Sequence, residues 1–155
     1  MLDQHDLYRQ VIFETLGPMA QVKSADLIAA GNHNQGIKLD TSEGVFFLKL
    51  NFDHERDILA KEAEGLQRLR KSTFLKIPQT FGHGRIEDHN YLLSEFIASS
   101  RHKLDYWEDL GLGLAHLHLT NSTSFGLESD NYIASLYQKN HQEATWRPLV
   151  WKCDL

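Results

Sequence analysis

The chain is poor in cysteine. Cys153 is its single cysteine, so an internal disulfide is excluded and a reducing compartment is favoured. The sequence also has no run of apolar residues long enough to span a bilayer. Residues 1–17 lack the basic start and the apolar core of a signal peptide. From these absences we expect a cytoplasmic protein with no membrane partner.

Positive charge is not in excess either. The chain carries 16 Lys and Arg against 21 Asp and Glu, a net charge of −5, which argues against nucleic acid as the main partner. The nine histidines are scattered. His116 and His118 stand two positions apart on an expected helix, where they do not share a face. We therefore predict no metal site in this chain.

The spacing of apolar residues predicts an α+β fold. Asp6 is the expected cap of a first helix, and Gly17 and Pro18 end it. The pattern gives five antiparallel strands with one helix inserted between the third and the fourth, then a linker of small residues and a further helix. From residue 120 onward the chain is expected to be irregular. The expected strands are 22–30, 37–41, 45–51, 79–86 and 91–97, and the expected helices are 6–16, 54–71 and 104–119.

The third strand carries a lysine on an otherwise apolar face. Alternation places Phe46, Leu48, Leu50 and Phe52 on one side of this strand and Lys49 on the other. An ammonium group in that position needs an anion. The alternative is an edge strand whose lysine reaches water or prevents edge pairing.

Glu62 is the expected partner of this lysine. It lies within the apolar stripe of the inserted helix, four residues from both Ile58 and Leu66. Lys49 and Glu62 would each be an unpaired charge on an inward face unless they meet, which would cost several kcal/mol. The alternative is that Glu62 reaches solvent at the edge of the stripe. Gly65 in the same helix suggests the close approach of another backbone.

A polar loop with glycine at both ends, residues 31–36, precedes the lysine strand by one strand. It could be a simple hairpin connection, or it could fold over an anion held by Lys49. It is not a Walker loop, because no Gly-Lys-Ser/Thr follows. A strand lysine, an inward helix glutamate and a preceding glycine-bounded loop together form the arrangement that holds ATP in protein-kinase-like folds.

From about residue 22 to residue 146 the sequence resembles the fructosamine (ketosamine) 3-kinase family, within the wider aminoglycoside-phosphotransferase-like group. Several short stretches in a specific order carry this resemblance. They are Gly31 and Asn34, FFLKLN at 46–51, KEAEGL at 61–66, Ile77 with Pro78, YLLSEFI at 91–97, Gly113 with LAHLH at 114–118, FGLESDNYI at 125–133, Gln138 and Asn140.

The resemblance implies a protein-kinase-like N-lobe in residues 1–97, and a hinge with the start of an incomplete C-lobe in residues 98–155. ATP is the implied cofactor: Lys49 would bind its phosphates, Glu62 would orient Lys49, and main-chain groups of the hinge would meet adenine. Asp130, Asn131, Gln138 and Asn140 belong to a stretch that also resembles the family, and we assign this stretch no chemical role. The implied ATP-contacting residues are Lys49, Glu62, Gly31, Asn34, Glu95, Phe96 and Ile97.

The sequence also departs from this family. Ala30 and His33 stand in the loop where the family usually has a second glycine and an isoleucine. We find no His-Gly-Asp-like catalytic motif with a following asparagine, and no second aspartate to hold Mg²⁺, because neither His5-Asp6 nor the stretch 102–105 has the spacing. We therefore assign no catalytic residue and no metal ligand. Residues after 146 resemble a frame change, an early stop or a fragment.

Three functions remain in view. The resemblance implies ATP-dependent phosphorylation of the sugar hydroxyl of small or protein-bound glycated amines, which leads to deglycation. We expect this truncated chain to be inactive by itself. A second reading is a non-catalytic ATP-binding or protein-interaction module, with an apolar surface around Trp107, Leu110 and Leu114 covered by a partner. A third is a kinase for another small molecule, such as choline or an aminoglycoside.

Overall fold

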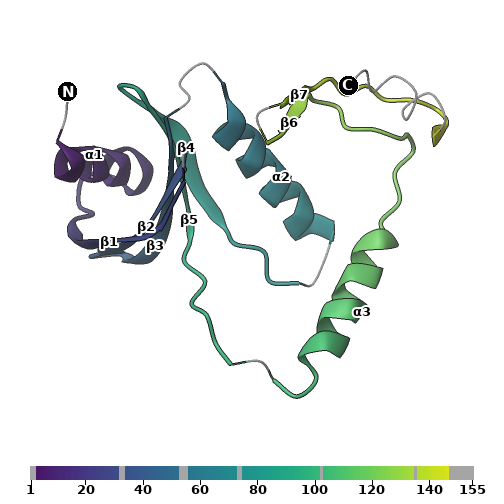
Figure 1. The fold of residues 1–155 in the computed structure, drawn as a ribbon, viewed down its shortest axis with the longest axis horizontal. Helices are drawn as coiled ribbons and strands as arrows, with labels where there is room; N and C mark the ends of the chain where they lie inside the picture. The colour runs from purple at the N-terminus through teal and green to yellow at the C-terminus, as the bar shows by residue number, and fades with distance from the viewer. Residues whose placement is uncertain are drawn as a thin grey trace.

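A computed structural model of the chain describes residues 3–31, 34–52, 56–72, 75–101, 103–134 and 136–146. At its centre is a five-stranded antiparallel sheet with the strand order β1-β2-β3-β5-β4 (Figure 1). This confirms the predicted α+β fold, in which one helix is inserted between the third and fourth strands. The strands are β1 (Val22–Ala30), β2 (Asn34–Thr41), β3 (Gly44–Asn51), β4 (Thr80–Ile86) and β5 (His89–Glu95).

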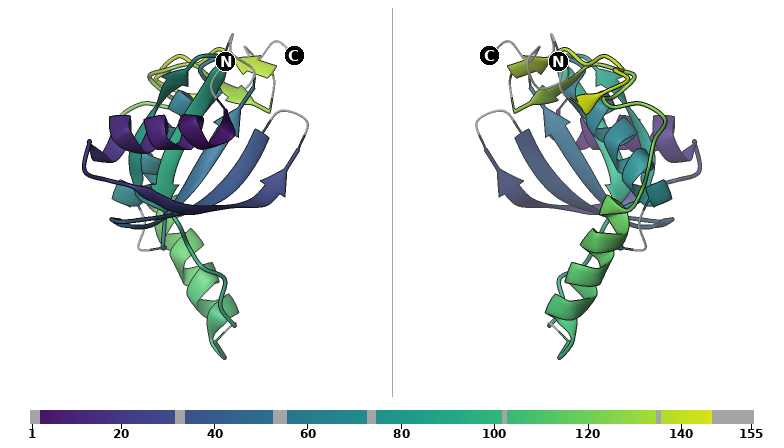
Figure 2. Two further views of the ribbon diagram at one scale, coloured as in Figure 1. Left: turned by 90° about the vertical axis from the view of Figure 1, so that its left-hand side faces the viewer. Right: turned by 90° about the vertical axis from the view of Figure 1, so that its right-hand side faces the viewer.

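Helices cover both faces of the sheet. α1 (Gln4–Leu16) lies on one face and α2 (Ile58–Ser72) on the other, as Figure 1 shows. α3 (Tyr106–His118) projects away from the sheet (Figure 2). Two short strands, β6 (Asn131–Ile133) and β7 (Leu136–Gln138), pair with each other beside α2.

The main core lies between the sheet and α1. Phe46, Leu48 and Leu50 of β3 are buried in it, as their alternation predicts. Phe52 was expected on the same face but is exposed, because β3 ends at Asn51. A second, smaller cluster on the opposite face joins α2 to the sheet through Leu59, Ala63 and Leu92. Lys49 therefore lies on the face that α2 covers.

The first helix begins earlier than predicted, because its cap is Asp3 and not Asp6. The Asp3 carboxylate Oδ1 accepts a hydrogen bond from the backbone N–H of Asp6, at 2.8 Å. Gly17 ends the helix as predicted. It has a φ of 96°, and its N–H donates to the carbonyl oxygen of Phe13.

The second helix is shorter at its start than predicted. Residues 53–55 lie outside the described residues, and Arg56 and Asp57 are not helical, so α2 begins at Ile58. The inference about Gly65 is wrong for the described chain, because a Cβ atom built there would meet no atom within 4 Å. This glycine is not required by packing against any described neighbour.

The third helix leaves much of its apolar side exposed. Trp107 is 71% exposed and Leu114 is also exposed, while Leu110 is only half-buried. The buried position is Gly113, where an added Cβ would lie 2.1 Å from the side chain of Leu75. In the described part of the chain, α3 therefore makes its buried contact at this glycine and leaves Trp107 and Leu114 exposed.

Candidate functional site

Lys49 and Glu62 meet on the α2 side of the sheet. The Nζ atom of Lys49 lies 2.6 Å from Oε2 of Glu62, and the two side chains are 27% and 35% exposed. The predicted pair is confirmed. Because β3 lies between β2 and β5, the edge-strand alternative for Lys49 is wrong, and Glu62 does not simply turn to solvent. Partial shielding from water strengthens such a pair relative to fully exposed ion pairs.

Small residues lie beside Lys49 on the sheet. Gly36 of β2 stands directly opposite Lys49, and Ala29 of β1 stands opposite Gly36. Residues that are directly paired in an antiparallel sheet present their side chains on the same face. A Cβ at Gly36 would lie only 3.0 Å from the ring of Phe47. The ring of Phe47 therefore occupies the space over Gly36 that a side chain there would need.

The loop between β1 and β2 is tighter than predicted. β2 already begins at Asn34, and the N–H of Gly31 donates to the carbonyl oxygen of Asn34 at 2.8 Å. His33 and its neighbour at position 32 lie outside the described residues. The Oδ1 atom of Asn34 accepts a hydrogen bond from Nδ2 of the buried Asn51, at 2.8 Å. The loop is thus a hairpin connection tied to the end of β3, and its role over a phosphate stays a prediction.

These residues border a cleft of about 740 Å³, within the size range of small-molecule and cofactor sites. Among the described residues of its wall, Lys49, Arg56 and Lys61 carry positive charge and Glu62 is the single carboxylate. Amide groups of three asparagines add further hydrogen-bonding capacity. This donor set fits the phosphates of a nucleotide. The asparagines are Asn34, Asn51 and Asn131.

The residues expected at the hinge lie away from this cleft. Glu95 stands opposite Phe46, so its side chain is on the α1 side of the sheet. Its carboxylate lies 3.1 Å from Nζ of Lys76 and accepts a hydrogen bond from the N–H of Gln79 at 3.3 Å; these two contacts lower its pKa.

The two residues that follow β5 complete the expected hinge. The Lys38 ammonium group lies 5.7 Å from the centre of the Phe96 ring, and Ile97 is exposed. Lys49, Glu62 and Asn34 therefore line one cleft, whereas the three hinge residues are not among its lining residues. Contacts between the hinge main chain and adenine stay a prediction.

Sequence reasoning missed part of the cleft wall. Lys61 precedes Glu62 directly, but nothing in the helix pattern marked it as a site residue. Tyr132 comes from β6. It lies in a stretch that contributes to the family resemblance but was given no chemical role. Its position depends on a contact with Asp57, which is distant in sequence. The available signal was the resemblance of the stretch 125–133 to the family.

Two features are absent from the described residues: a membrane-spanning helix and a cluster of metal-binding side chains. No helix among them is long and apolar enough to cross a membrane. In the same ranges, no three His, Cys, Asp or Glu side chains gather as a candidate metal site. The expectation concerning Mg²⁺ therefore stays a prediction from the sequence.

Comparisons with known proteins agree with one another. A family model described as fructosamine kinase matches residues 5–151. The chain is 30% identical over 138 residues to a "Probable ketoamine kinase" from Synechocystis, covering 88% of the chain and 47% of that protein. It is 31% identical over 125 residues to a "Probable ketoamine kinase" from Enterococcus faecium, covering 81% and 43%. The chain thus spans about half the length of the curated relatives it matches.

The fold comparison gives the same extent. The crystal structure of a protein assigned as a fructosamine-3-kinase from Haemophilus somnus superposes with a TM-score of 0.80 at 24% identity. The match covers 94% of this chain and 50% of that one. At this identity the superposition shows a shared fold.

Proposed function

Because the chain belongs to the fructosamine kinase family, we propose that it binds ATP for a kinase that phosphorylates the sugar hydroxyl of glycated amines. Such phosphorylation leads to deglycation of the amine. The observation that carries the proposal is the Lys49–Glu62 contact of 2.6 Å at the wall of a cationic cleft. Kinase relatives support the reaction class, and the cleft supports the nucleotide.

Each residue has a distinct task in this proposal. Bound ATP supplies the phosphoryl group. Lys49 holds phosphate oxygens with its ammonium group, and Glu62 keeps that group in one place before the ligand arrives. Asn34, tied to Asn51, fixes the start of β2 beside the same cleft. Preorganised charges of this kind stabilise developing negative charge without further rearrangement.

We further propose that these residues by themselves transfer the phosphoryl group very slowly. Transfer needs a base to receive the proton of the sugar hydroxyl and carboxylates to hold Mg²⁺. The sequence contains no His-Gly-Asp-like motif that could supply them. Binding of ATP and transfer of its phosphoryl group are therefore expected to separate in this chain.

Two measurements test the proposal. Titration calorimetry with ATP should show binding, and incubation with γ-labelled ATP and a fructosamine should give almost no labelled product. Rapid labelling of the fructosamine would contradict slow transfer, and labelling of choline or an aminoglycoside instead would change the substrate class. Translation of the encoding DNA beyond codon 146 in all frames adds a cheap check, because a recovered His-x-Asp segment would supply the missing groups.

A second candidate is a non-catalytic module that binds ATP or another protein. The exposed apolar residues Trp107 and Leu114 on α3 favour it. On this reading the purified chain self-associates, and Trp107→Glu returns it toward the monomer. Light scattering that shows a monomer for the unaltered chain would count against this candidate.

A further inference from the structure

Polar contacts join the described residues of the segment 129–140, which are all of its residues except position 135. Its strands β6 and β7 pair in antiparallel register. Asp130 precedes them, and its carboxylate accepts hydrogen bonds from the hydroxyl of Tyr137 and from the backbone N–H of Asn140. These two donors, Tyr137 first, lower the pKa of Asp130. The side-chain amide of Asn140 donates to the carbonyl oxygen of Ser129 and to Oδ1 of Asn131, so the two ends of the segment are joined.

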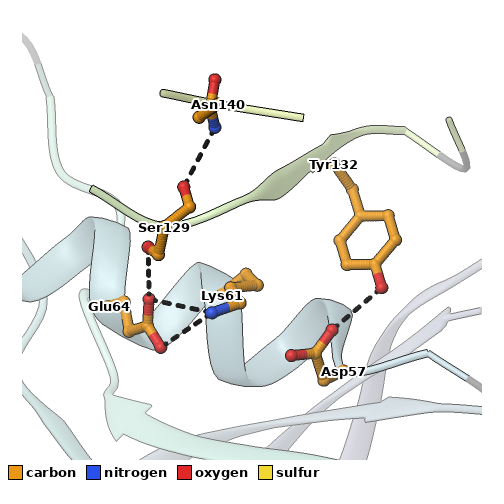
Figure 3. Close-up of polar contacts among 6 residues, drawn as sticks. All are labelled: Asp57, Lys61, Glu64, Ser129, Tyr132 and Asn140. Atoms are coloured by element: carbon orange, nitrogen blue, oxygen red, sulfur yellow. Dashed lines mark hydrogen bonds and ion pairs between the residues drawn. The ribbon is translucent and has the colours of Figure 1, made fainter. Parts of the chain in front are cut away.

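The 129–140 segment contacts Asp57, which directly precedes α2, and Glu64 within the helix, as Figure 3 shows. The Tyr132 hydroxyl donates a hydrogen bond to Oδ1 of Asp57 at 2.9 Å. The Ser129 hydroxyl donates to Oε2 of Glu64 at 3.2 Å. Glu64 also pairs with Lys61, whose Nζ atom lies 3.2 Å from its Oε1. In both contacts a neutral hydroxyl group donates to a charged carboxylate, and such hydrogen bonds are stronger than those between two neutral groups.

These contacts lie on the outer side of the helix. Asp57 precedes α2, and its carbonyl oxygen accepts from the N–H of Lys61, so it continues the helical spacing and lies on the same side as Glu64, seven positions on. Leu59 and Ala63 lie on the other side, where they pack on Leu92 of the sheet. The helix is therefore held between the sheet and the 129–140 segment. Glu62 lies between the two outer contacts, so both resist rotation and sliding of the turn that carries it.

A further contact with the chain after the hinge lies just beyond the C-terminal end of α2. Leu75 follows α2 after a short gap, and its side chain packs at Gly113 of α3. The two attachments lie near opposite ends of the helix. The 129–140 segment is the one beside the cleft, since Asn131 and Tyr132 line its wall together with Lys49 and Glu62.

We propose that the 129–140 segment positions α2 so that Glu62 stays in contact with Lys49. Ser129 and Tyr132 are the positioning residues, and Asp130 and Asn140 keep the segment in the shape that presents them. This inference deepens the proposed function and rests on it for the consequence in ATP binding. The positions of α2 and Lys49 can be measured without any nucleotide.

The test compares the double variant S129A/Y132F with the double variant S24A/Y8F. The control removes the same two hydroxyl groups from β1 and α1, where Ser24 is exposed and Tyr8 lies in the core on the far face of the sheet. Hydrogen exchange followed by mass spectrometry reports the amides of α2 and of β3. Acetylation of Lys49, measured relative to the exposed Lys23, reports whether its ammonium group is still held.

In S129A/Y132F we expect exchange of the α2 amides and acetylation of Lys49 to rise by about tenfold, while β3 and the control stay near the unaltered protein. Unchanged exchange in α2 would overturn the proposal. Faster exchange with unchanged acetylation of Lys49 would overturn it too, because the segment would then only cover the helix. Asp57→Asn keeps a neutral oxygen acceptor for Tyr132 and should raise the exchange of the α2 amides less than Asp57→Ala does.

ATP titration separates this inference from the proposed function. If both nucleotide-free measurements rise as expected and the unaltered protein binds no ATP, the proposed function fails and the positioning role stands. If the unaltered protein binds ATP and S129A/Y132F binds it with the same affinity, the positioning role fails and the proposed function stands.

Discussion

Lys49 and Glu62 are 13 positions apart in sequence, and their charged atoms lie 2.6 Å apart between β3 and α2. Neither element alone fixes this contact. β3 places the ammonium group on the α2 face, and the packing of Leu59 and Ala63 on Leu92 brings the helix within reach. The contact therefore reports the relative position of the helix and the sheet.

Lys49→Met should abolish measurable ATP binding, because it removes the cation expected at the phosphates. A lost hydrogen bond to a charged group is worth about 1.5–3 kcal/mol, or at least about a tenfold loss of affinity. Lys23→Met removes an exposed lysine from β1 and should leave affinity unchanged. Calorimetric titration measures both, and unchanged affinity in Lys49→Met would remove the central support for the ATP site.

Gly113→Ala should destabilise the protein by about 1–3 kcal/mol, because the added methyl group would overlap the side chain of Leu75. Gly111→Ala is the matched control on the same helix. A Cβ there meets no atom within 4 Å, so it should stabilise by about 0.5–1 kcal/mol. Urea unfolding of the two variants measures this difference in free energy, and equal effects would mean that α3 does not pack on Leu75.

Asp3→Ala should cost about 1 kcal/mol of stability through loss of the cap of α1. Asp6→Ala should cost less, since Asp6 forms a surface ion pair with Arg9 at 3.3 Å and such pairs contribute little. Thermal unfolding of both variants measures the difference. A larger loss for Asp6→Ala would restore the sequence-based assignment of the cap.

Tyr91→Phe should reduce the fall in the free energy of unfolding that occurs above about pH 10. Burial raises the pKa of the Tyr91 phenol above its usual 10.0, and the nearby Glu14 carboxylate adds to this effect. Above that pH the unfolded chain loses the phenol proton while the folded chain keeps it. Stability is therefore fully present below about pH 10 and falls as the pH rises through the folded pKa. Urea unfolding of both proteins across this range measures the effect, and parallel curves would contradict it.

The central part of the site could be predicted from the sequence because it follows from two periodicities. Alternation along β3 separates Lys49 from Leu48 and Leu50, and the apolar stripe of α2 includes Glu62. Two inward charges on neighbouring elements then need each other. The same local signals also give the five strands, although β2 begins at Asn34 and β5 at His89, before their expected first residues 37 and 91.

The rest depends on contacts that no local pattern reveals. β6 and β7 are three residues each, and the 129–140 segment is held by Asp130 and Asn140 instead of by an apolar face. On α3, Trp107 and Leu114 follow a helical period, which indicates a helix but not the partner that its apolar side packs against. Periodicity predicted both an element and its packing only where that element buries its own stripe of apolar side chains.

The contacts that hold α2 also set an order of events during synthesis. Ser129 and Glu64 are 65 positions apart, and Tyr132 and Asp57 are 75 apart, whereas β2 and β3 pair through a turn between Thr41 and Gly44. Because local contacts form before distant ones, the sheet can assemble on a growing chain while α2 still lacks its outer support. If the 129–140 segment positions α2 as proposed, we expect the helix to reach its final place only after residue 140 has left the ribosome, and an interrupted translation product to carry the sheet with an unsecured Glu62.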